Sequence, residues 1–321
     1  MYFVMHDIGN GAFIENLLND NQMIIEPLYL PTQQTCGCQF YIYRGDLECS
    51  VAPGNKRHKL KYHLQQASKE NKNILATFGG PHSNHIAAFV AQCKHQGLTP
   101  LIVVRGETWA KLTPTLRQAV DSGALLFPSE RVDYKLGLRA NIKKVVDEYY
   151  DHQVYWIPEG GAGAEGVRGC LDWANEIYRL CRGKPFHLCI ASGTGTTAAG
   201  FAASGFSSMT VFSALKGGDS LKTDIENQCL DAGLSINTSI KGFDEALHGG
   251  FGKVSTAQLD FLKTLKTLNP DIPLDPLYTS KMVYKVNQLC AQGEWQHNHT
   301  LFVHTGGLQG WQGLPLEKQV Y

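Results

Sequence analysis

The chain alternates short apolar runs with longer stretches in which apolar residues recur at helical spacing. Short apolar runs bounded by polar turns predict buried strands, and a three-to-four-residue spacing predicts amphipathic helices. The predicted strands are Phe40 to Leu47, Ile74 to Phe78, Leu101 to Val104, Ala124 to Phe127, Val154 to Ile157, Phe186 to Ala191, Met209 to Leu215 and Leu301 to His304. The predicted helices include His85 to Gly97, Lys111 to Gly123, Leu138 to Tyr150, Ala164 to Arg182, Ala198 to Ser204, Ser220 to Ala232, Ser255 to Leu268 and Ser280 to Gln292. This alternation predicts an α/β protein whose largely parallel sheets are flanked by helices.

Composition narrows the classes of partner. The 321 residues carry 29 Lys plus Arg and 29 Asp plus Glu, so no net field attracts nucleic acid or an anionic membrane. The longest uncharged run, 186–215, is rich in Gly, Ser and Thr, which makes it a poor membrane helix. The nine cysteines, irregularly spaced and odd in number, predict free thiols without a metal site in a cytoplasmic protein, and the first residues lack the pattern of a signal peptide.

The stretch from Ala52 to Gly97 carries the first candidate chemistry. Lys56 stands at the start of a predicted helix, while the neighbouring Lys59 and Lys61 are expected on its solvated face. Farther on, an apolar strand ends in two glycines, and Ser83 with Asn84 forms a predicted N-cap of the next helix. Because helix N-termini attract negative charge, a lysine and a serine in these positions suit an anionic cofactor.

A second candidate is the loop Ser192-Gly193-Thr194-Gly195-Thr196-Thr197, which follows a strand and opens a helix. Its glycines let backbone amides close around an anion, and the threonine hydroxyls add donors, so the loop predicts a phosphate site. The loop lacks the lysine of a nucleotide P-loop. It also satisfies a loose dinucleotide fingerprint, with Asp219 at a suitable distance for a ribose contact. The loop by itself therefore leaves a nicotinamide enzyme and a monophosphate cofactor both open.

Five motifs in order resemble those of the 1-aminocyclopropane-1-carboxylate deaminase and D-cysteine desulfhydrase family. Gly54 to Leu60 resembles its GNK-x-RKL motif, with His58 in place of the arginine. The other four are Gly79 to His85, which resembles GG-x-x-SN, the loop Ser192 to Thr197, Asp275 to Thr279, which resembles DP-x-YT, and His304 to Gly307, which resembles HTGG. The resemblance covers about residues 25 to 313 and is more specific for the family than for one substrate.

The resemblance implies a pyridoxal 5'-phosphate enzyme of fold type II, the tryptophan synthase β type, with two α/β domains. Residues 1–59 and 163–321 would form the large cofactor-binding domain and residues 60–162 the smaller one. The enzyme would be a homodimer that acts on a small amino acid.

The motifs also imply a role for each matching residue. Lys56 would bind the cofactor covalently and then act as the base at the substrate α carbon, with Ser83 and Tyr278 as the other catalytic residues. Asn84 would contact the phenolic oxygen of the cofactor, and Thr279 or Thr305 its ring nitrogen. The phosphate would be held by Gly193, Thr194, Gly195, Thr196 and Thr197.

Two positions bear on the substrate. The aminocyclopropane deaminases that the chain resembles carry a glutamate where Thr279 stands, and a hydroxyl leaves the cofactor ring nearer neutral than a carboxylate does. This favours β-elimination from D-cysteine over ring opening, the alternative. Phe251 stands where the family usually has a second active-site tyrosine, which points to a different substrate preference. A non-catalytic binding protein and a nicotinamide oxidoreductase are the rival classes.

Overall fold

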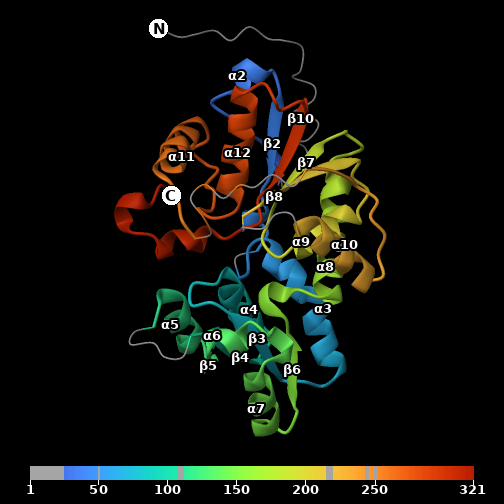
Figure 1. Cartoon of the computed structure of the whole chain (residues 1–321), viewed down its shortest axis with the longest axis vertical. Helices are drawn as coiled ribbons and strands as arrows, with labels where there is room; N and C mark the ends of the chain where they lie inside the picture. Colours follow the sequence, from blue (N-terminus) through green and yellow to red (C-terminus); the bar gives the residue numbers. More distant parts are fainter. Residues whose placement is uncertain are drawn as a thin grey trace.

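Two β-sheets organise the protein in the computed structural model, which describes residues 25–49, 51–106, 112–214, 220–242, 246, 248, 250 and 252–321 (Figure 1). The six-stranded sheet has the order β1 (Ile25–Pro27), β2 (Gln39–Tyr43), β10 (His299–Val303), β7 (His187–Ser192), β8 (Ser208–Ser213) and β9 (Ser239–Gly242). The four-stranded sheet has the order β5 (Leu125–Ser129), β4 (Thr99–Arg105), β3 (Ile74–Gly79) and β6 (Val154–Ile157). Only the pairing of β1 with β2 is antiparallel among these strands, so the predicted α/β class is confirmed.

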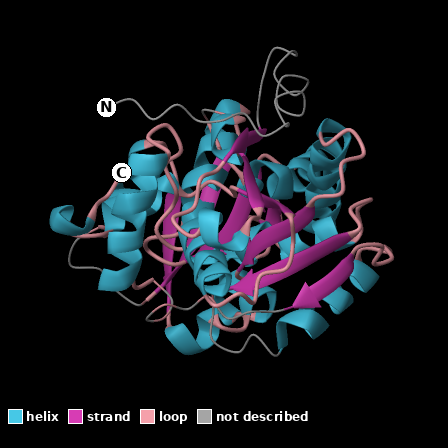
Figure 2. Ribbon diagram, turned by 90° about the horizontal axis from the view of Figure 1, so that it is seen from above, coloured by secondary structure: helices cyan, strands magenta, loops and turns pink. Residues whose placement is uncertain are grey.

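Helices cover both faces of each sheet (Figures 1 and 2). The six-stranded sheet packs against α8 (Ala164–Leu180), α9 (Thr196–Ala202) and α10 (Leu221–Asp231) on one face, and against α11 (Thr256–Leu268) and α12 (Thr279–Ala291) on the other. The four-stranded sheet lies between α3 (Asn55–Lys69), α4 (Asn84–His95) and α5 (Pro114–Asp121) on one face and α6 (Arg131–Tyr134) and α7 (Asn141–Tyr149) on the other. The remaining helical segments are α2 (Gln33–Cys36) and the 3-10 turns Gly45–Leu47, Gly137–Arg139, Glu159–Gly161, Leu308–Gly313 and Leu316–Lys318.

The alternation of side chains along the central strands explains their continuous apolar sequence. In β10, Leu301 and Val303 face the core under α8 to α10, while Phe302 faces the core under α11 and α12. A strand with both faces buried needs apolar residues at successive positions, because neighbouring side chains point to opposite sides.

Helix α8 approaches its neighbours closely through glycines. A Cβ atom on Gly169 would lie 1.9 Å from the backbone oxygen of His58 in α3, and one on Gly200 in α9 would lie 2.4 Å from the Cβ of Cys170. The backbones of α3, α8 and α9 therefore touch at positions where no side chain fits. This contact fixes the N-termini of α3 and α9 relative to each other.

Some expected boundaries differ from those observed. The strand predicted to reach Leu47 ends at Tyr43, because Arg44 turns inward to pair with Glu26 at 2.8 Å and Asp46 at 2.9 Å. The predicted domain boundary after residue 59 falls inside the continuous helix α3, and the division into domains stays a prediction. All nine cysteines are free, as expected. Among the described residues, no helix combines the length and hydropathy needed to cross a bilayer.

Acid is expected to destabilise the fold through buried neutral histidines such as His187. Its ring accepts or donates hydrogen bonds at both nitrogens, to Ser208 Oγ at 2.9 Å and Thr210 Oγ1 at 2.8 Å, and stacks on His297. Burial, followed by the nearby His297 and Lys241, lowers the pKa of His187 from 6.5 to about 3. The depressed pKa favours the neutral ring in the fold, so this stability is present above pH 6.5 and is lost as the pH falls toward 3.

The measurement is urea unfolding of wild type and His187→Asn between pH 7 and pH 4. We expect the free energy of unfolding to fall more steeply with decreasing pH for wild type than for His187→Asn. The difference in slope should reach at most about 1.4 kcal/mol per pH unit, the contribution of this one group. His95→Asn, at an exposed position near the end of α4, is the control and should keep the wild-type slope. Equal slopes for wild type and His187→Asn would exclude His187 as the source.

Candidate functional site

The N-terminus of α3 lies against the segment that follows β10. The Asn55 amide donates to the carbonyl of Thr305 at 3.2 Å, and a Cβ atom on Gly54 would lie 2.1 Å from the same oxygen. Gly54 also has a φ of 77°, which favours glycine. The GNK and HTGG motifs, about 250 residues apart in the sequence, therefore form one backbone contact.

Lys56 follows directly and is half-buried. Its Nζ donates to Asn55 Oδ1 at 2.9 Å, and Asn55 Nδ2 in turn donates to Thr197 Oγ1 at 2.9 Å. Burial, and then the charge of Lys59, lowers the pKa of Lys56 to about 7. The lowered pKa raises the share of Lys56 that is unprotonated near neutral pH, and the unprotonated amine is the form that acts as a nucleophile and a base.

Lys59 corrects one expectation from the sequence. Its exposed fraction is 4%, whereas Lys61 lies on the surface and pairs with Asp172 at 2.5 Å, so the prediction of a solvated face is wrong for Lys59 and correct for Lys61. Burial lowers the pKa of Lys59, and its charge acts on Cys170 and on Lys56. Its spacing of three residues from Lys56, which puts both on one helix face, was the signal that could have located it.

The loop 192–197 joins β7 to α9 beside these lysines. Gly195 is left-handed at φ 87° and precedes the first turn of α9. The loop is tied to α10, where Gln228 Nε2 donates to the Thr194 carbonyl at 2.8 Å and Gln228 Oε1 accepts from Thr196 Oγ1 at 2.7 Å. Ser192 Oγ is buried without a hydrogen-bond partner among the described residues. The loop thus has both the glycine conformation and the spare donor that an anion site uses.

Ser83 and Asn84 lie at the start of α4, as predicted. Ser83 is the N-cap, and its Oγ accepts from the His85 amide at 3.2 Å. A Cβ atom on Gly307 would lie 2.8 Å from Asn84 Nδ2 and 3.5 Å from the Cβ of Asp275. The Asn84 side chain, from the helix after β3, therefore reaches the segments that precede α12 and follow β10.

Asp275 organises the start of α12. This buried carboxylate accepts from the amides of Leu277 and Tyr278 through Oδ1, at 3.0 and 2.7 Å, and from the amide of Thr279 through Oδ2, at 2.8 Å. Burial, followed by the charges of Asp275 and Glu159, raises the pKa of Tyr278 to about 12. Thr279 Oγ1 is buried and has no hydrogen-bond partner in the described part of the chain.

The turn after β10 is fixed by His304. The Gly306 amide donates to His304 Nδ1 at 3.0 Å, so Nε2 carries the proton and donates to the Pro273 carbonyl at 2.9 Å. Thr305 is buried between these contacts, and its carbonyl accepts from the Asn55 amide. The turn is thereby held against both α3 and the segment before α12.

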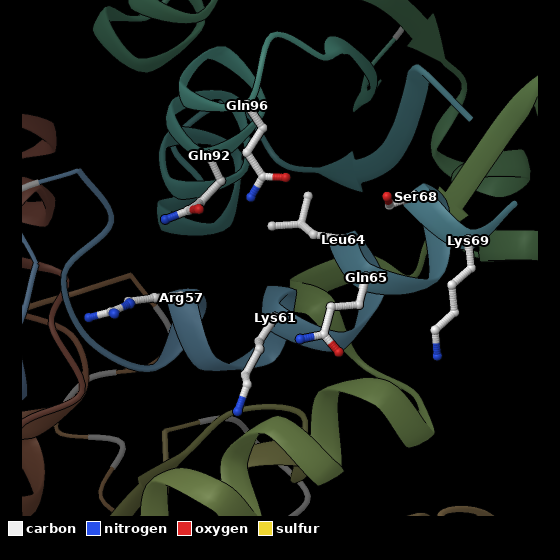
Figure 3. A pocket seen from close by; sticks show the side chains of 8 residues that line it. All are labelled: Arg57, Lys61, Leu64, Gln65, Ser68, Lys69, Gln92 and Gln96. Carbon is white, nitrogen blue, oxygen red and sulfur yellow. The ribbon is translucent and has the colours of Figure 1, made fainter. Parts of the chain in front are cut away.

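The structure brings the motif residues together around four helix starts, those of α3, α4, α9 and α12. Gln228 joins them without having been singled out from the sequence, whereas Asp275 lay in the DP-x-YT segment without an assigned role and Lys59 was expected in solvent. Phe251 and Asp219 lie outside the described residues. A surface groove of 530 Å³ between α3 and α4 is a different feature, since none of the predicted site residues lines it (Figure 3). Its lining residues are Arg57, Lys61, Leu64, Gln65, Ser68, Lys69, Gln92 and Gln96.

Comparison with known proteins gives several relatives over most of the chain. A protein of Pyrococcus horikoshii assigned as a 1-aminocyclopropane-1-carboxylate deaminase is 27% identical over 297 residues, which cover 88% of this chain and 89% of that protein. The bifunctional D-cysteine desulfhydrase/1-aminocyclopropane-1-carboxylate deaminase of Arabidopsis thaliana is 26% identical and covers 85% of this chain and 73% of that protein. A crystal structure of an ACC deaminase homologue superposes with a TM-score of 0.74 at 25% identity, over 89% of both chains. The resemblance to this family is confirmed.

More distant structures share the fold with these relatives. The O-acetylserine-dependent cystathionine β-synthase of Helicobacter pylori has a TM-score of 0.62 at 13% identity, covering 92% of this chain and 95% of that one. Threonine deaminase isoform 2 of Solanum lycopersicum has a TM-score of 0.60 at 14% identity, covering 91% and 80%. At such identities the likeness concerns the fold alone. No family model matches the chain.

Proposed function

We propose that this protein is a pyridoxal-phosphate-dependent lyase that eliminates the β substituent of a small amino acid, with D-cysteine as the preferred substrate. The observation that carries the proposal is the Lys56 amine, whose pKa lies near 7 and which Asn55 links to Thr197 of the 192–197 loop. A nucleophilic amine and a phosphate-binding loop in contact through one residue are what a phosphorylated aldehyde requires. The relatives' names support the same class of reaction.

The donor set fits the cofactor along its length. Lys56 would hold it covalently, and the amides of residues 193–197, with the buried Lys59 as counter-charge, would hold its phosphate. Asn84 Nδ2 would donate to its phenolic oxygen. Thr279, whose buried hydroxyl has no partner among the described residues, suits the ring nitrogen better than Thr305. The bound cofactor supplies the electron sink that stabilises negative charge at the substrate α carbon.

The side chains divide the proton transfers. Ser83, at the start of α4, would orient the substrate carboxylate, since the helix N-terminus attracts negative charge. The free Lys56 amine would remove the α proton, for which a pKa near 7 is well matched at neutral pH. The raised pKa of Tyr278 keeps its hydroxyl protonated at neutral pH, and this hydroxyl would be the second proton-transfer group beside Lys56. The carbon–sulfur bond of D-cysteine would break with release of sulfide, and the enamine product would hydrolyse to pyruvate and ammonia.

Thr279 favours elimination over ring opening. A buried hydroxyl next to the ring nitrogen does not keep that nitrogen protonated as a glutamate would, so the electron sink is weaker. Thiolate is a good leaving group and needs only a modest sink, whereas an unactivated cyclopropane needs more. Deamination of 1-aminocyclopropane-1-carboxylate is the second candidate, because the relatives in Pyrococcus and Thermotoga carry that assignment.

The decisive test is product release from the purified, cofactor-loaded protein. We expect sulfide and pyruvate from D-cysteine, little of either from L-cysteine, and no 2-oxobutanoate from 1-aminocyclopropane-1-carboxylate. Free cofactor with D-cysteine and no protein is the control for uncatalysed chemistry. Release of 2-oxobutanoate and ammonia from the cyclopropane, without sulfide from D-cysteine, would overturn the argument from Thr279.

The two-domain division and the homodimer implied by the family are also proposals. The four-stranded sheet lies entirely within 60–162, which supports a smaller domain there, and a homodimer is expected from the resemblance alone. Light scattering of the purified chain measures the second point.

A further inference from the structure

Gln228 on α10 contacts the 192–197 loop through both polar atoms of its side-chain amide. Nε2 donates to the Thr194 carbonyl at 2.8 Å, and Oε1 accepts the Thr196 hydroxyl proton at 2.7 Å. The same Nε2 lies 2.8 Å from the position that a Cβ atom on Gly195 would occupy. One side chain from another helix thus contacts three consecutive residues of the loop.

These contacts fix two features of the loop. The Thr196 hydroxyl has a single proton, which goes to Gln228, so Thr196 has only lone pairs left to offer and would not attract a phosphate through its hydroxyl. The Thr194 carbonyl is drawn toward α10, away from the amides that would face an anion. If the peptide after Thr194 rotated, its carbonyl would replace an amide donor with a negative dipole end.

We propose that Gln228 is a positioning residue that holds the 192–197 loop in its phosphate-binding conformation. The inference rests on the proposed function, because the anion is taken to be the cofactor phosphate. Gln228 acts through the loop: it keeps the Thr194 carbonyl and the Thr196 hydroxyl directed to α10, and it packs where only a glycine at 195 leaves room. The Thr197 hydroxyl accepts from Asn55 and also hydrogen-bonds the Cys170 side chain, so the phosphate would be held mainly by the backbone amides that Gln228 keeps in place.

The test compares pyridoxal 5'-phosphate with pyridoxal, which lacks the phosphate, as ligands of the apoprotein. Gln228→Met keeps the side-chain length and removes both hydrogen bonds. We expect it to weaken binding of pyridoxal 5'-phosphate roughly 10-fold or more, while pyridoxal binds as to wild type. The ³¹P resonance of the bound phosphate should shift as well. Asn227→Ala, the exposed neighbour on α10, is the matched control and should change neither.

Two further variants separate the contacts. Thr196→Val removes the hydroxyl that donates to Gln228 and leaves the contact of Gln228 with Thr194 in place. It should weaken the binding of pyridoxal 5'-phosphate but not that of pyridoxal, and it tests the proposal even if Gln228→Met does not fold. In Gln228→Glu the carboxylate can accept from Thr196 but cannot donate to Thr194, and it adds a negative charge. This variant should therefore bind pyridoxal 5'-phosphate no more tightly than Gln228→Met does. Equal loss of both ligands, or no loss of either, would overturn the role of Gln228. If wild type itself binds pyridoxal as tightly as its phosphate, the proposed function fails instead.

Discussion

Substituting alanine for Lys56 is expected to lower turnover at least about 10³-fold and to abolish the visible absorption of covalently held cofactor. Lys56 is the half-buried amine whose pKa is near 7 and which Asn55 orients at the start of α3. The same amine would serve as nucleophile toward the cofactor and as base toward the substrate, so its loss removes both steps. Absorption spectroscopy of the reconstituted protein and single-turnover assays measure the two effects.

Lys59→Met and Lys61→Met are the controls. Lys59 is buried and also has a lowered pKa, so its replacement should weaken cofactor binding while the absorption of the lysine-bound cofactor remains. Lys61 is a surface residue paired with Asp172, so its replacement should change neither property. A covalent band that persists in Lys56→Ala and vanishes in Lys59→Met would transfer the covalent role to Lys59.

Gly169→Ala should destabilise the fold by about 2–4 kcal/mol, although alanine is the better helix former by about 1 kcal/mol. The new Cβ atom would lie 1.9 Å from the His58 carbonyl, and a backbone atom at that distance must move. Helices α3 and α8 would move apart, which would displace Lys56 and lengthen the hydrogen bond from Asn55 to Thr197. Urea unfolding measures the first effect, and cofactor affinity measures the second.

Glu176→Ala is the control on the same helix, since Glu176 is exposed. It tests whether a side-chain change on α8 matters by itself, and we expect a change within about 0.5 kcal/mol. A Gly169→Ala protein of wild-type stability would mean that α3 and α8 can move apart freely. In that case the position of Lys56 would not depend on this contact.

The sequence predicted most of the fold because its signals are local. Strand and helix periodicity depends on neighbouring residues, so the parallel sheets could be predicted from the chain itself. The predicted helix starts at His85 and Ser280 lie within one residue of the observed starts at Asn84 and Thr279. The motifs placed Lys56, Ser83 and Tyr278 as candidates. Their burial and their pKa values could not be predicted, because those depend on segments distant in the sequence that cover them.

Lys59 and Gln228 show where local reasoning ends. A lysine is mostly exposed, so the sequence placed Lys59 in solvent, and only the packing of α3 against α8 and the 159–161 turn buries it. Gln228 carries no motif, and its contact with Thr194 and Thr196 arises because β8 pairs with β7 and brings α10 beside α9. The sequence alone thus determined most of the elements, the fold class and the family resemblance, but not short elements such as β9, α2 and α6. The tertiary structure decided which side chains are desolvated and which hydroxyls already have partners, because both depend on contacts between distant segments.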